Sequence, residues 1–308
     1  MLIAQCRRSR GMEAVMNYEK IAVTGGAGLL GAHVMHRLAG KAALTSVDMK
    51  PPVEANAGLG AHVTASITDF EAMRAAFEGQ DAVIHLAAIP NPREATPELT
   101  FNNNVQGTWA VFEAAAQAGV KRVVVASSDS VFGLSYNPPD WPPQYLPVDE
   151  AHPTRPTEVY SLSKKVTETI AESYAARGAM EVMAIRPSHI LFPRGYGEFE
   201  ARGADPQNYH FWAWVDPDDV AQGFDLAVNA REYRGFDVFT ITAADGLNTR
   251  PTLEMAAERW EIMPEIRRPE VYERLATASV LDITKARERL GYAPTVDRAG
   301  LAAKAAAR

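Results

Sequence analysis

Short apolar runs and segments of helical periodicity alternate along the chain from about residue 18 onward. The apolar runs lack the polar alternation of a half-exposed strand, which favours strands covered on both faces within a parallel sheet. Helices between such strands imply right-handed crossovers, so we predict an α/β, Rossmann-type doubly wound fold. The predicted strands span residues 21–23, 44–47, 62–65, 82–86, 123–126, 182–185 and 238–241, and the predicted helices residues 29–38, 70–77, 105–118, 159–177, 218–228, 252–260 and 283–290.

Two segments depart from this alternation of strands and helices. Residues 134–156 are rich in proline and aromatic residues and are too long for a plain connector, and the pattern loosens again after Pro187. The alanine-rich C-terminal end is expected to be a frayed helix or tail. The predicted parts are a disordered N-terminal extension (residues 1–17), a Rossmann domain (18–186, with 218–242 returning to it) and a small C-terminal substrate lobe (187–217 and 243–308).

Charge and cysteine content exclude several classes of protein. The formal net charge is −7, so the basic surface typical of nucleic-acid-binding proteins is not expected. No apolar run approaches the roughly 20 residues that a membrane helix needs. Cys6 is the only cysteine, which excludes an internal disulfide and fits a reducing, cytoplasmic compartment. We therefore expect a cytoplasmic protein that acts on a small molecule, without a nucleic-acid or membrane partner.

A glycine-rich segment, Thr-Gly-Gly-Ala-Gly-Leu-Leu-Gly over residues 24–31, joins the first predicted strand to the first predicted helix. Gly25 permits the tight turn, Gly28 lets the backbone approach a pyrophosphate, and Gly31 lets the helix pack against the sheet. The helix that opens with Leu29 and Leu30 offers unpaired N–H groups to phosphate. This context predicts a dinucleotide-binding site.

Asp48 ends the second predicted strand. A carboxylate there can accept hydrogen bonds from both ribose hydroxyls of NAD and would repel the 2′-phosphate of NADP. Lys50 follows closely and could compensate that repulsion. We predict NAD as the cofactor, and no metal.

Tyr160 and Lys164 are four residues apart and therefore share one face of a predicted helix. An unperturbed tyrosine has a pKa of about 10, and we expect the positive charges of Lys164 and an oxidised nicotinamide to lower the pKa of Tyr160. Ser128 lies at the carboxyl end of the fifth predicted strand, where ligands bind in such folds, and its hydroxyl can bond a reacting oxygen. These three residues predict an acid/base site.

These segments together resemble the extended short-chain dehydrogenases/reductases, the family of NAD-dependent epimerases and dehydratases. The resemblance extends from about residue 21 to residue 187 in one consistent order and continues at residues 218–221. The matching pieces are residues 24–31, Asp48, His85-Leu86-Ala87-Ala88, Asn103-Asn104-Val105-Gln106-Gly107-Thr108, residues 127–133 (Ser-Ser-Asp-Ser-Val-Phe-Gly), residues 160–164 (Tyr-Ser-Leu-Ser-Lys), Arg186-Pro187 and Asp218-Asp219-Val220-Ala221.

The resemblance implies a role for each matching position. Ser128 is the expected catalytic hydroxyl residue, Tyr160 the expected acid or base, and Lys164 the residue that orients ribose and tunes Tyr160. The further cofactor-binding residues implied are Leu86, Ala87 and Ala88 along the cofactor channel, Asn104 in support of the active site, Pro187 at the nicotinamide end, and Ser66 and Ile67 at the adenine end, where many relatives carry Asp.

The substrate is expected to be compact. Only residues 188–217 separate the Arg-Pro strand from the Asp-Asp-Val helix, and such a small lobe has little area to cover a nucleotide diphosphate. Asn208-Tyr209-His210 is similar to a stretch in uronate dehydrogenases, in which an arginine that grips the carboxylate stands at about the position of His210. Arg194 or Arg202 could replace it. The predicted substrate contacts are Ser128, Asp129, Ser188, His189, Arg194 and His210.

The favoured function is NAD-dependent oxidation of a hydroxyl on a small sugar or sugar acid, in which Tyr160 as phenolate takes the proton. The alternatives are a UDP-sugar 4-epimerase with tightly bound NAD and a non-catalytic NAD-binding sensor. A dehydratase is disfavoured because Ser130 replaces the second carboxylate that those relatives carry after Asp129. His85, Trp212 and Trp214 are expected to be packing residues. As in relatives, the helices at 105–118 and 159–177 could form a homodimer.

Overall fold

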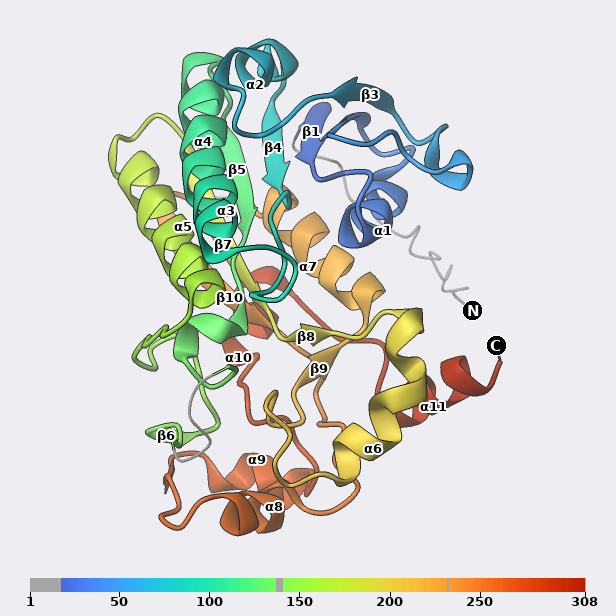
Figure 1. The fold of residues 1–308 in the computed structure, drawn as a ribbon, viewed down its shortest axis with the longest axis vertical. Helices are drawn as coiled ribbons and strands as arrows, with labels where there is room; N and C mark the ends of the chain where they lie inside the picture. Colours follow the sequence, from blue (N-terminus) through green and yellow to red (C-terminus); the bar gives the residue numbers. More distant parts are fainter. Residues whose placement is uncertain (1–17, 137–140, 232, 308) are drawn as a thin grey trace, which may run out of the picture.

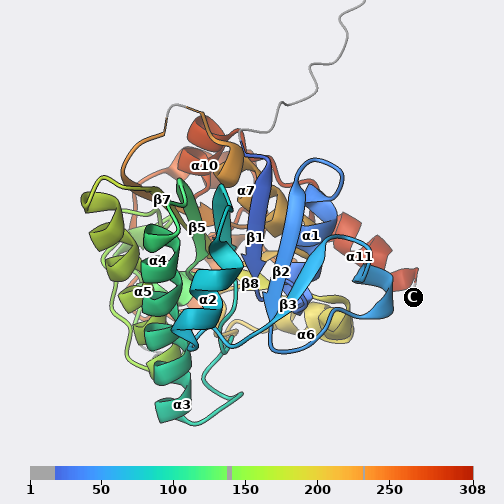
Figure 2. The ribbon, with the colours of Figure 1, turned by 90° about the horizontal axis from the view of Figure 1, so that it is seen from above.

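The computed structural model describes residues 18–136, 141–231 and 233–307. At its centre is a seven-stranded parallel sheet in the order β10-β7-β5-β4-β1-β2-β3, which confirms the predicted Rossmann-type fold (Figures 1 and 2). The expectation of a disordered extension at residues 1–17 lies outside the described residues. The strands are β1 (Lys20–Thr24), β2 (Ala43–Asp48), β3 (Ala61–Thr64), β4 (Ala82–His85), β5 (Arg122–Ala126), β7 (Glu181–Pro187) and β10 (Phe236–Ile241).

Helices cover both faces of this sheet (Figure 2). On β1, Ile21 and Val23 pack into one core layer, and Ala22 between them packs into the other. Because both layers are buried, the three middle positions of the strand are all apolar, which explains the continuous apolar runs in the sequence. The first layer involves α1 (Leu29–Leu38), α7 (Pro217–Asn229) and α10 (Thr284–Leu290), and the second α2 (Phe70–Phe77), α4 (Gly107–Gln117) and α5 (Val159–Ala176).

The helix predicted over residues 105–118 begins earlier in the structure, at residue 97. A continuous helical segment begins at α3 (Pro97–Phe101), passes through a π-helical turn, η2 (Asn102–Gln106), and continues as α4. Thr96 caps the start by accepting a hydrogen bond from the N–H of Leu99. Within the π-turn, the Asn104 side chain reaches the β4 exit loop, where it accepts the Ile89 N–H at 2.8 Å.

The rest of the chain gathers at the carboxyl end of the sheet, in the lower part of Figure 1. Trp212 and Trp214 are fully buried in a separate apolar core there, as their expected packing role requires. The division into a Rossmann domain and a substrate lobe stays a prediction. The elements are α6 (Phe199–Ala204), α8 (Thr252–Arg259), α9 (Pro269–Arg274), α11 (Arg298–Ala306), the strand pair β8 (His189–Ile190) and β9 (Trp214–Val215), and the pair β6 (Tyr145–Leu146) and β11 (Glu265–Ile266).

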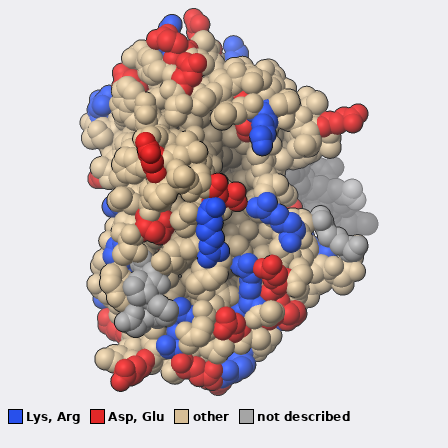
Figure 3. Space-filling view, viewed as in Figure 1, with Lys and Arg blue, Asp and Glu red and all other residues tan. Residues whose placement is uncertain are grey.

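Two helical parts of this region were not predicted from the sequence, α9 and the segment at residues 193–204. The pattern loosens after Pro187 in the sequence, yet residues 193–204 form η4 (Pro193–Glu198) and α6. The expected frayed end is α11, which begins where the Asp297 carboxylate accepts the Gly300 N–H. Within the described part of the chain, no helix combines the length and apolarity that a membrane span requires. Acidic and basic side chains are interspersed on the face shown in Figure 3.

Candidate active site

A cleft of about 980 Å³ runs along the carboxyl ends of the central strands. It begins at the β1–α1 turn, passes the end of β5 and the start of α5, and ends among residues of the lower region. The carboxyl edge of a parallel sheet is the usual ligand site of doubly wound folds, and the volume suits a large ligand. The predicted site residues that line the cleft are Gly25, Gly28, Leu29, Leu30, Gly31, Asp48, Ile67, Leu86, Ala87, Ala88, Ser128, Asp129, Tyr160, Lys164, Pro187, Ser188, His189, Arg194 and His210.

The glycines at the β1–α1 turn are required by the close approach of backbone segments. Gly25 has φ +73°, and a Cβ there would lie 2.8 Å from the backbone N of Ala87. A Cβ on Gly31 would lie 2.0 Å from the carbonyl O of Gly25. Gly28 is the N-cap of α1 and has no side-chain cap, so the first N–H groups of the helix face the cleft without a competing carboxylate. This turn fits a dinucleotide pyrophosphate.

Asp48 lies at the same end of the cleft as the glycine turn, where β2 ends. Its carboxylate oxygens accept hydrogen bonds from the backbone N–H groups of Ala27 and Lys50, both at 3.2 Å. These bonds hold the carboxylate beside the glycine turn, where a ribose would lie. Ser66 does not line the cleft, and its hydroxyl bonds Thr68, so its adenine contact stays a prediction.

Ser128, Tyr160 and Lys164 meet on one wall of the cleft, and all three are buried. The Ser128 hydroxyl donates to the Asp129 carboxylate at 3.2 Å and lies close enough to the Tyr160 phenol to lower its pKa. The Lys164 ammonium donates to the carbonyl of Ala126 at 2.9 Å and lies 5.8 Å from the Tyr160 ring centroid. Helix α5 starts one residue before Tyr160 because the Glu158 carboxylate accepts the N–H groups of Tyr160 and Ser161, both at 2.6 Å.

Burial dominates the acid/base properties of this wall. Burial raises the pKa of Tyr160 well above its ordinary value, and the nearby Ser128 hydroxyl offsets only part of that rise. Within the protein alone the pKa of Tyr160 is not lowered as expected, because burial outweighs the groups that lower it. Burial lowers the pKa of Lys164 to about 8 and raises that of Asp129 to about 7.

Two buried networks hold this wall in place. Glu168 on α5 accepts hydrogen bonds from the Ser127 hydroxyl at 2.6 Å and from Arg186 on β7 at 2.7 and 2.9 Å. Asn104 bonds both the N–H and the carbonyl of Ile89 and donates to the Ser163 hydroxyl on α5. Asn104 does not line the cleft, but it couples the β4 exit loop to the catalytic helix.

His85 is a packing residue, as expected. It is 3% exposed, and its ring nitrogens hydrogen-bond Thr24 and Thr108. Burial lowers the pKa of His85 to about 3, so the ring is neutral.

The opposite end of the cleft holds a stacked pair of histidines. The ring centroids of His189 and His210 are 4.1 Å apart at an interplanar angle of 16°. Burial lowers the pKa of both rings, that of His189 to about 4, so both are neutral donors and acceptors at neutral pH. Arg202 pairs with Glu198 at 2.7 Å and bonds His189 at 3.3 Å, and it does not line the cleft, whereas Arg194 does.

Sequence motifs did not identify several residues at this end. Asn91, Arg93, Ser135 and Tyr136 line the cleft, and so does Tyr209, which was noted only as a neighbour of His210. Arg93 and Tyr136 lie on loops a few residues beyond the matching pieces at β4 and β5. Their position after two adjacent parallel strands was the available signal.

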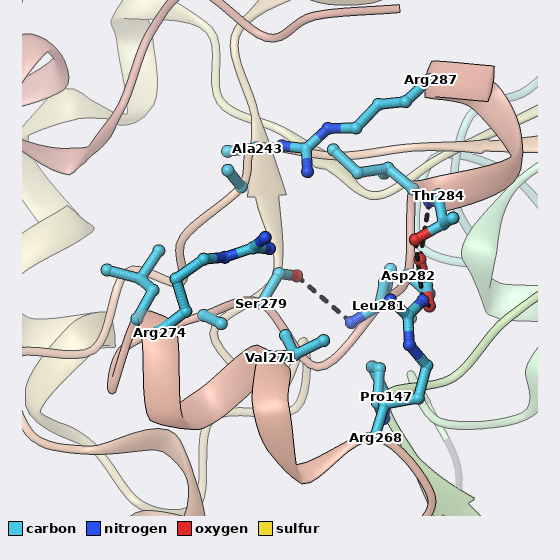
Figure 4. A pocket seen from close by; sticks show the side chains of 14 residues that line it. Pro147, Ala243, Arg268, Val271, Arg274, Ser279, Leu281, Asp282, Thr284 and Arg287 are labelled. Carbon is cyan, nitrogen blue, oxygen red and sulfur yellow. Dashed lines mark hydrogen bonds and ion pairs between the residues drawn. The ribbon is translucent and has the colours of Figure 1, made fainter.

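A second cavity of about 200 Å³ lies between α9 and α10 and shares no lining residue with the cleft (Figure 4). Arg268, Arg274 and Arg287 line it, and Arg268 pairs with Asp282. None of the predicted site residues is found there.

The comparisons with known proteins agree with this geometry. A sequence model described as the NAD dependent epimerase/dehydratase family matches residues 21–206. The chain belongs to this family. It is therefore an NAD-dependent enzyme of the short-chain dehydrogenase/reductase superfamily, and the predicted family, fold and cofactor are confirmed.

Three relatives illustrate the range of the epimerase/dehydratase family around this chain. L-arabinose 1-dehydrogenase (NAD(P)(+)) of Haloferax volcanii is 34% identical over 217 residues, which are 68% of this chain and 83% of that protein. Uronate dehydrogenase of Pseudomonas putida is 31% identical over 207 residues, 67% of this chain and 69% of that protein. The structure of UDP-glucose 4-epimerase from Brucella ovis in complex with NAD is similar in fold, with a TM-score of 0.72 at 21% identity, over 94% of this chain and 98% of that one.

Proposed function

We propose that this enzyme oxidises a hydroxyl of a small sugar or sugar acid with NAD, as an aldose or uronate dehydrogenase does. The observation that carries the proposal is the meeting of Ser128, Tyr160 and Lys164 on the wall of a cleft that also contains the glycine turn and Asp48. The names of the two sequence relatives, an arabinose and a uronate dehydrogenase, support a sugar as the substrate class.

In this mechanism the substrate hydroxyl bonds the Ser128 and Tyr160 oxygens, both of which line the cleft. Tyr160 as phenolate takes the hydroxyl proton. Bound NAD supplies the hydride acceptor and a positive charge on the nicotinamide. Lys164, anchored on the Ala126 carbonyl, would bond the cofactor ribose and balance the phenolate charge.

The protein alone keeps Tyr160 protonated, because burial raises the pKa of the phenol. The phenolate must therefore form when a cation lies beside it or when the pH is high. We expect sugar oxidation to rise with pH across the alkaline range and the reverse reaction, in which Tyr160 donates its proton, to be favoured toward neutral pH. Initial rates in both directions between pH 6 and 10 test this.

The small size of the segment between β7 and α7 favours a compact substrate. Residues 188–217 form only β8, η4, α6 and β9, and much of this segment is packed in the lower core. Little of it is left to cover a nucleotide diphosphate. This supports a free sugar or sugar acid over a UDP-sugar.

The test is absorbance at 340 nm with enzyme, NAD and a panel of free aldoses, uronates and UDP-sugars, followed by chromatography of each mixture. NADH formed with a free sugar or sugar acid supports the proposal. A UDP-sugar converted to its epimer without NADH would replace it with the epimerase alternative. NAD binding with neither change would indicate a non-catalytic sensor.

We also propose a homodimer in the cytoplasm. Apolar side chains on α3, α4 and α5 are exposed, which is unusual unless they contact a partner: Leu99 (55%), Phe101 (39%), Trp109 (47%) and Leu162 (42%). Sedimentation of the wild type and of Leu162→Glu tests this. A dimer that dissociates in the variant is the expected result, and a monomeric wild type contradicts the proposal.

A further inference from the structure

Arg93 extends from the β4 exit loop to the end of the cleft that is remote from Asp48. Its guanidinium carbon lies 5.3 Å from the ring centroid of Tyr209 and 5.7 Å from that of Tyr136. The two rings are themselves 5.7 Å apart. A guanidinium held against two aromatic rings is restricted in its rotation, while its N–H edge stays available to a planar acceptor.

The loop that carries Arg93 is tied to the catalytic helix. The Asn91 side chain accepts a hydrogen bond from the backbone N–H of Arg93 at 2.9 Å and donates one to the Glu94 carboxylate at 3.2 Å. Ile89, at the start of the loop, is held on both backbone groups by Asn104, which also bonds Ser163 on α5. Arg93 is therefore positioned relative to Tyr160, although it comes from another element.

Both tyrosines lie at turns with unusual backbone conformations. Tyr136 has φ +63°, and the two residues that follow His210, Phe211 and Trp212, have φ +52° and +62°. Side chains other than glycine rarely adopt such values, and they cluster at binding sites where the surrounding structure imposes them. Two separate strained turns thus bring Tyr136 and Tyr209 to the same guanidinium.

Among the described residues, no carboxylate lies within 4.0 Å of the Arg93 guanidinium, in contrast to Arg202 and its partner Glu198. The neighbouring His210 does not supply negative charge, and Arg194 adds a second cation to the cleft lining. The carboxylates on the lining are Asp48 beside the glycine turn, Asp129 and Glu94, and Glu94 accepts from Asn91. This end of the cleft therefore offers an anion-binding group without a resident anion.

We infer that Arg93 determines substrate specificity by binding an anionic group of the sugar, and that this group is a carboxylate. The inference rests on the proposed function and narrows it to sugar acids. A carboxylate can accept two parallel hydrogen bonds from the guanidinium edge, which a neutral hydroxymethyl group cannot. A phosphate ester shares this chemistry, and the test separates the two.

The test compares one sugar skeleton in three forms: a hexuronate, the neutral aldose and the aldose 6-phosphate. For each, kcat and KM are measured with NAD in the wild type, Arg93→Gln and Arg93→Lys. Arg289→Gln serves as the control, because Arg289 is an exposed arginine on α10 outside the cleft. Thermal unfolding of each variant verifies that it is folded.

In Arg93→Gln we expect kcat/KM for the hexuronate to fall about 10- to 100-fold, mainly through KM, because a charge-assisted contact is lost. The neutral aldose should change less than about twofold. Arg93→Lys should be intermediate, since it keeps the charge without the planar edge. Equal losses on all three sugars, or no loss on any, would overturn the inference while the dehydrogenase function stands. A selective loss on the 6-phosphate would overturn the choice of carboxylate.

If no sugar yields NADH, the proposed function has failed, and calorimetric titration of the hexuronate into the enzyme with NADH tests the anion site by itself. Hexuronate binding that weakens at least 10-fold in Arg93→Gln and not in Arg289→Gln supports the anion site at Arg93. Binding that is absent, or the same in both variants, overturns it.

Discussion

Replacing Glu168 by Gln isolates the energetic role of the buried network behind the catalytic wall. The side chains of Glu168 and Arg186 are 3% and 4% exposed, and Arg186 makes two hydrogen bonds to the carboxylate. The amide keeps the shape and one acceptor oxygen but leaves the guanidinium charge unpaired. Breaking a buried ion pair from one side typically costs about 3–5 kcal/mol. Because one acceptor remains, we expect the lower end, about 3 kcal/mol.

The measurement is urea denaturation of the wild type, Glu168→Gln and Glu258→Gln. Glu258 pairs with Arg250, and both side chains of that pair are nearly half exposed. An exposed pair is screened by water, so Glu258→Gln should leave the midpoint within error. If the two substitutions shifted the midpoint equally, the argument from burial would be refuted.

Three further predictions concern the cleft. Burial raises the pKa of Asp129 from 3.8 to about 7, so the folded chain keeps a proton that the unfolded chain releases, and the stability of the wild type should fall as pH rises from about 4 to about 7. Asp129→Asn should remove this contribution and be about 2–4 kcal/mol more stable than the wild type at pH 8, with no difference at pH 4. Denaturation of both proteins at each pH measures this. Gly31→Ala should abolish NAD binding in calorimetry, because its Cβ would lie 2.0 Å from the Gly25 carbonyl O, whereas Gly197→Ala, with open space around it, should bind normally. Asp48→Ala should raise KM for NAD about 10-fold and reduce the preference over NADP, and an unchanged NAD/NADP ratio would contradict its ribose role.

The sequence was most informative where backbone geometry demands particular residues. Glycine is required at residues 25 and 31 because a Cβ there would lie 2.8 or 2.0 Å from backbone atoms, so the turn could be recognised directly. The apolar strands were recognisable because the sheet is covered on both faces. Tyr160 and Lys164 were found because one helical turn fixes their relation.

Other features depend on tertiary contacts that no local pattern encodes. The polar run Asn102–Asn104 is helical because Asn104 finds partners on the β4 exit loop and on α5. The raised pKa of Tyr160 reflects burial by the whole wall, which spacing to Lys164 could not reveal. Arg93 and Tyr136 belong to different loops, and only the order β5-β4 in the sheet brings those loops together.

The most direct test of the proposed function is NADH formation at 340 nm by Tyr160→Phe, with the sugar that the wild type oxidises best and with NAD affinity measured in parallel by calorimetry. Phenylalanine keeps the ring and removes only the phenolic oxygen. The account predicts that kcat falls at least about 1,000-fold while NAD affinity changes less than about threefold. Turnover comparable to the wild type, with the same sugar and cofactor, would contradict the assignment of Tyr160 as the group that takes the proton.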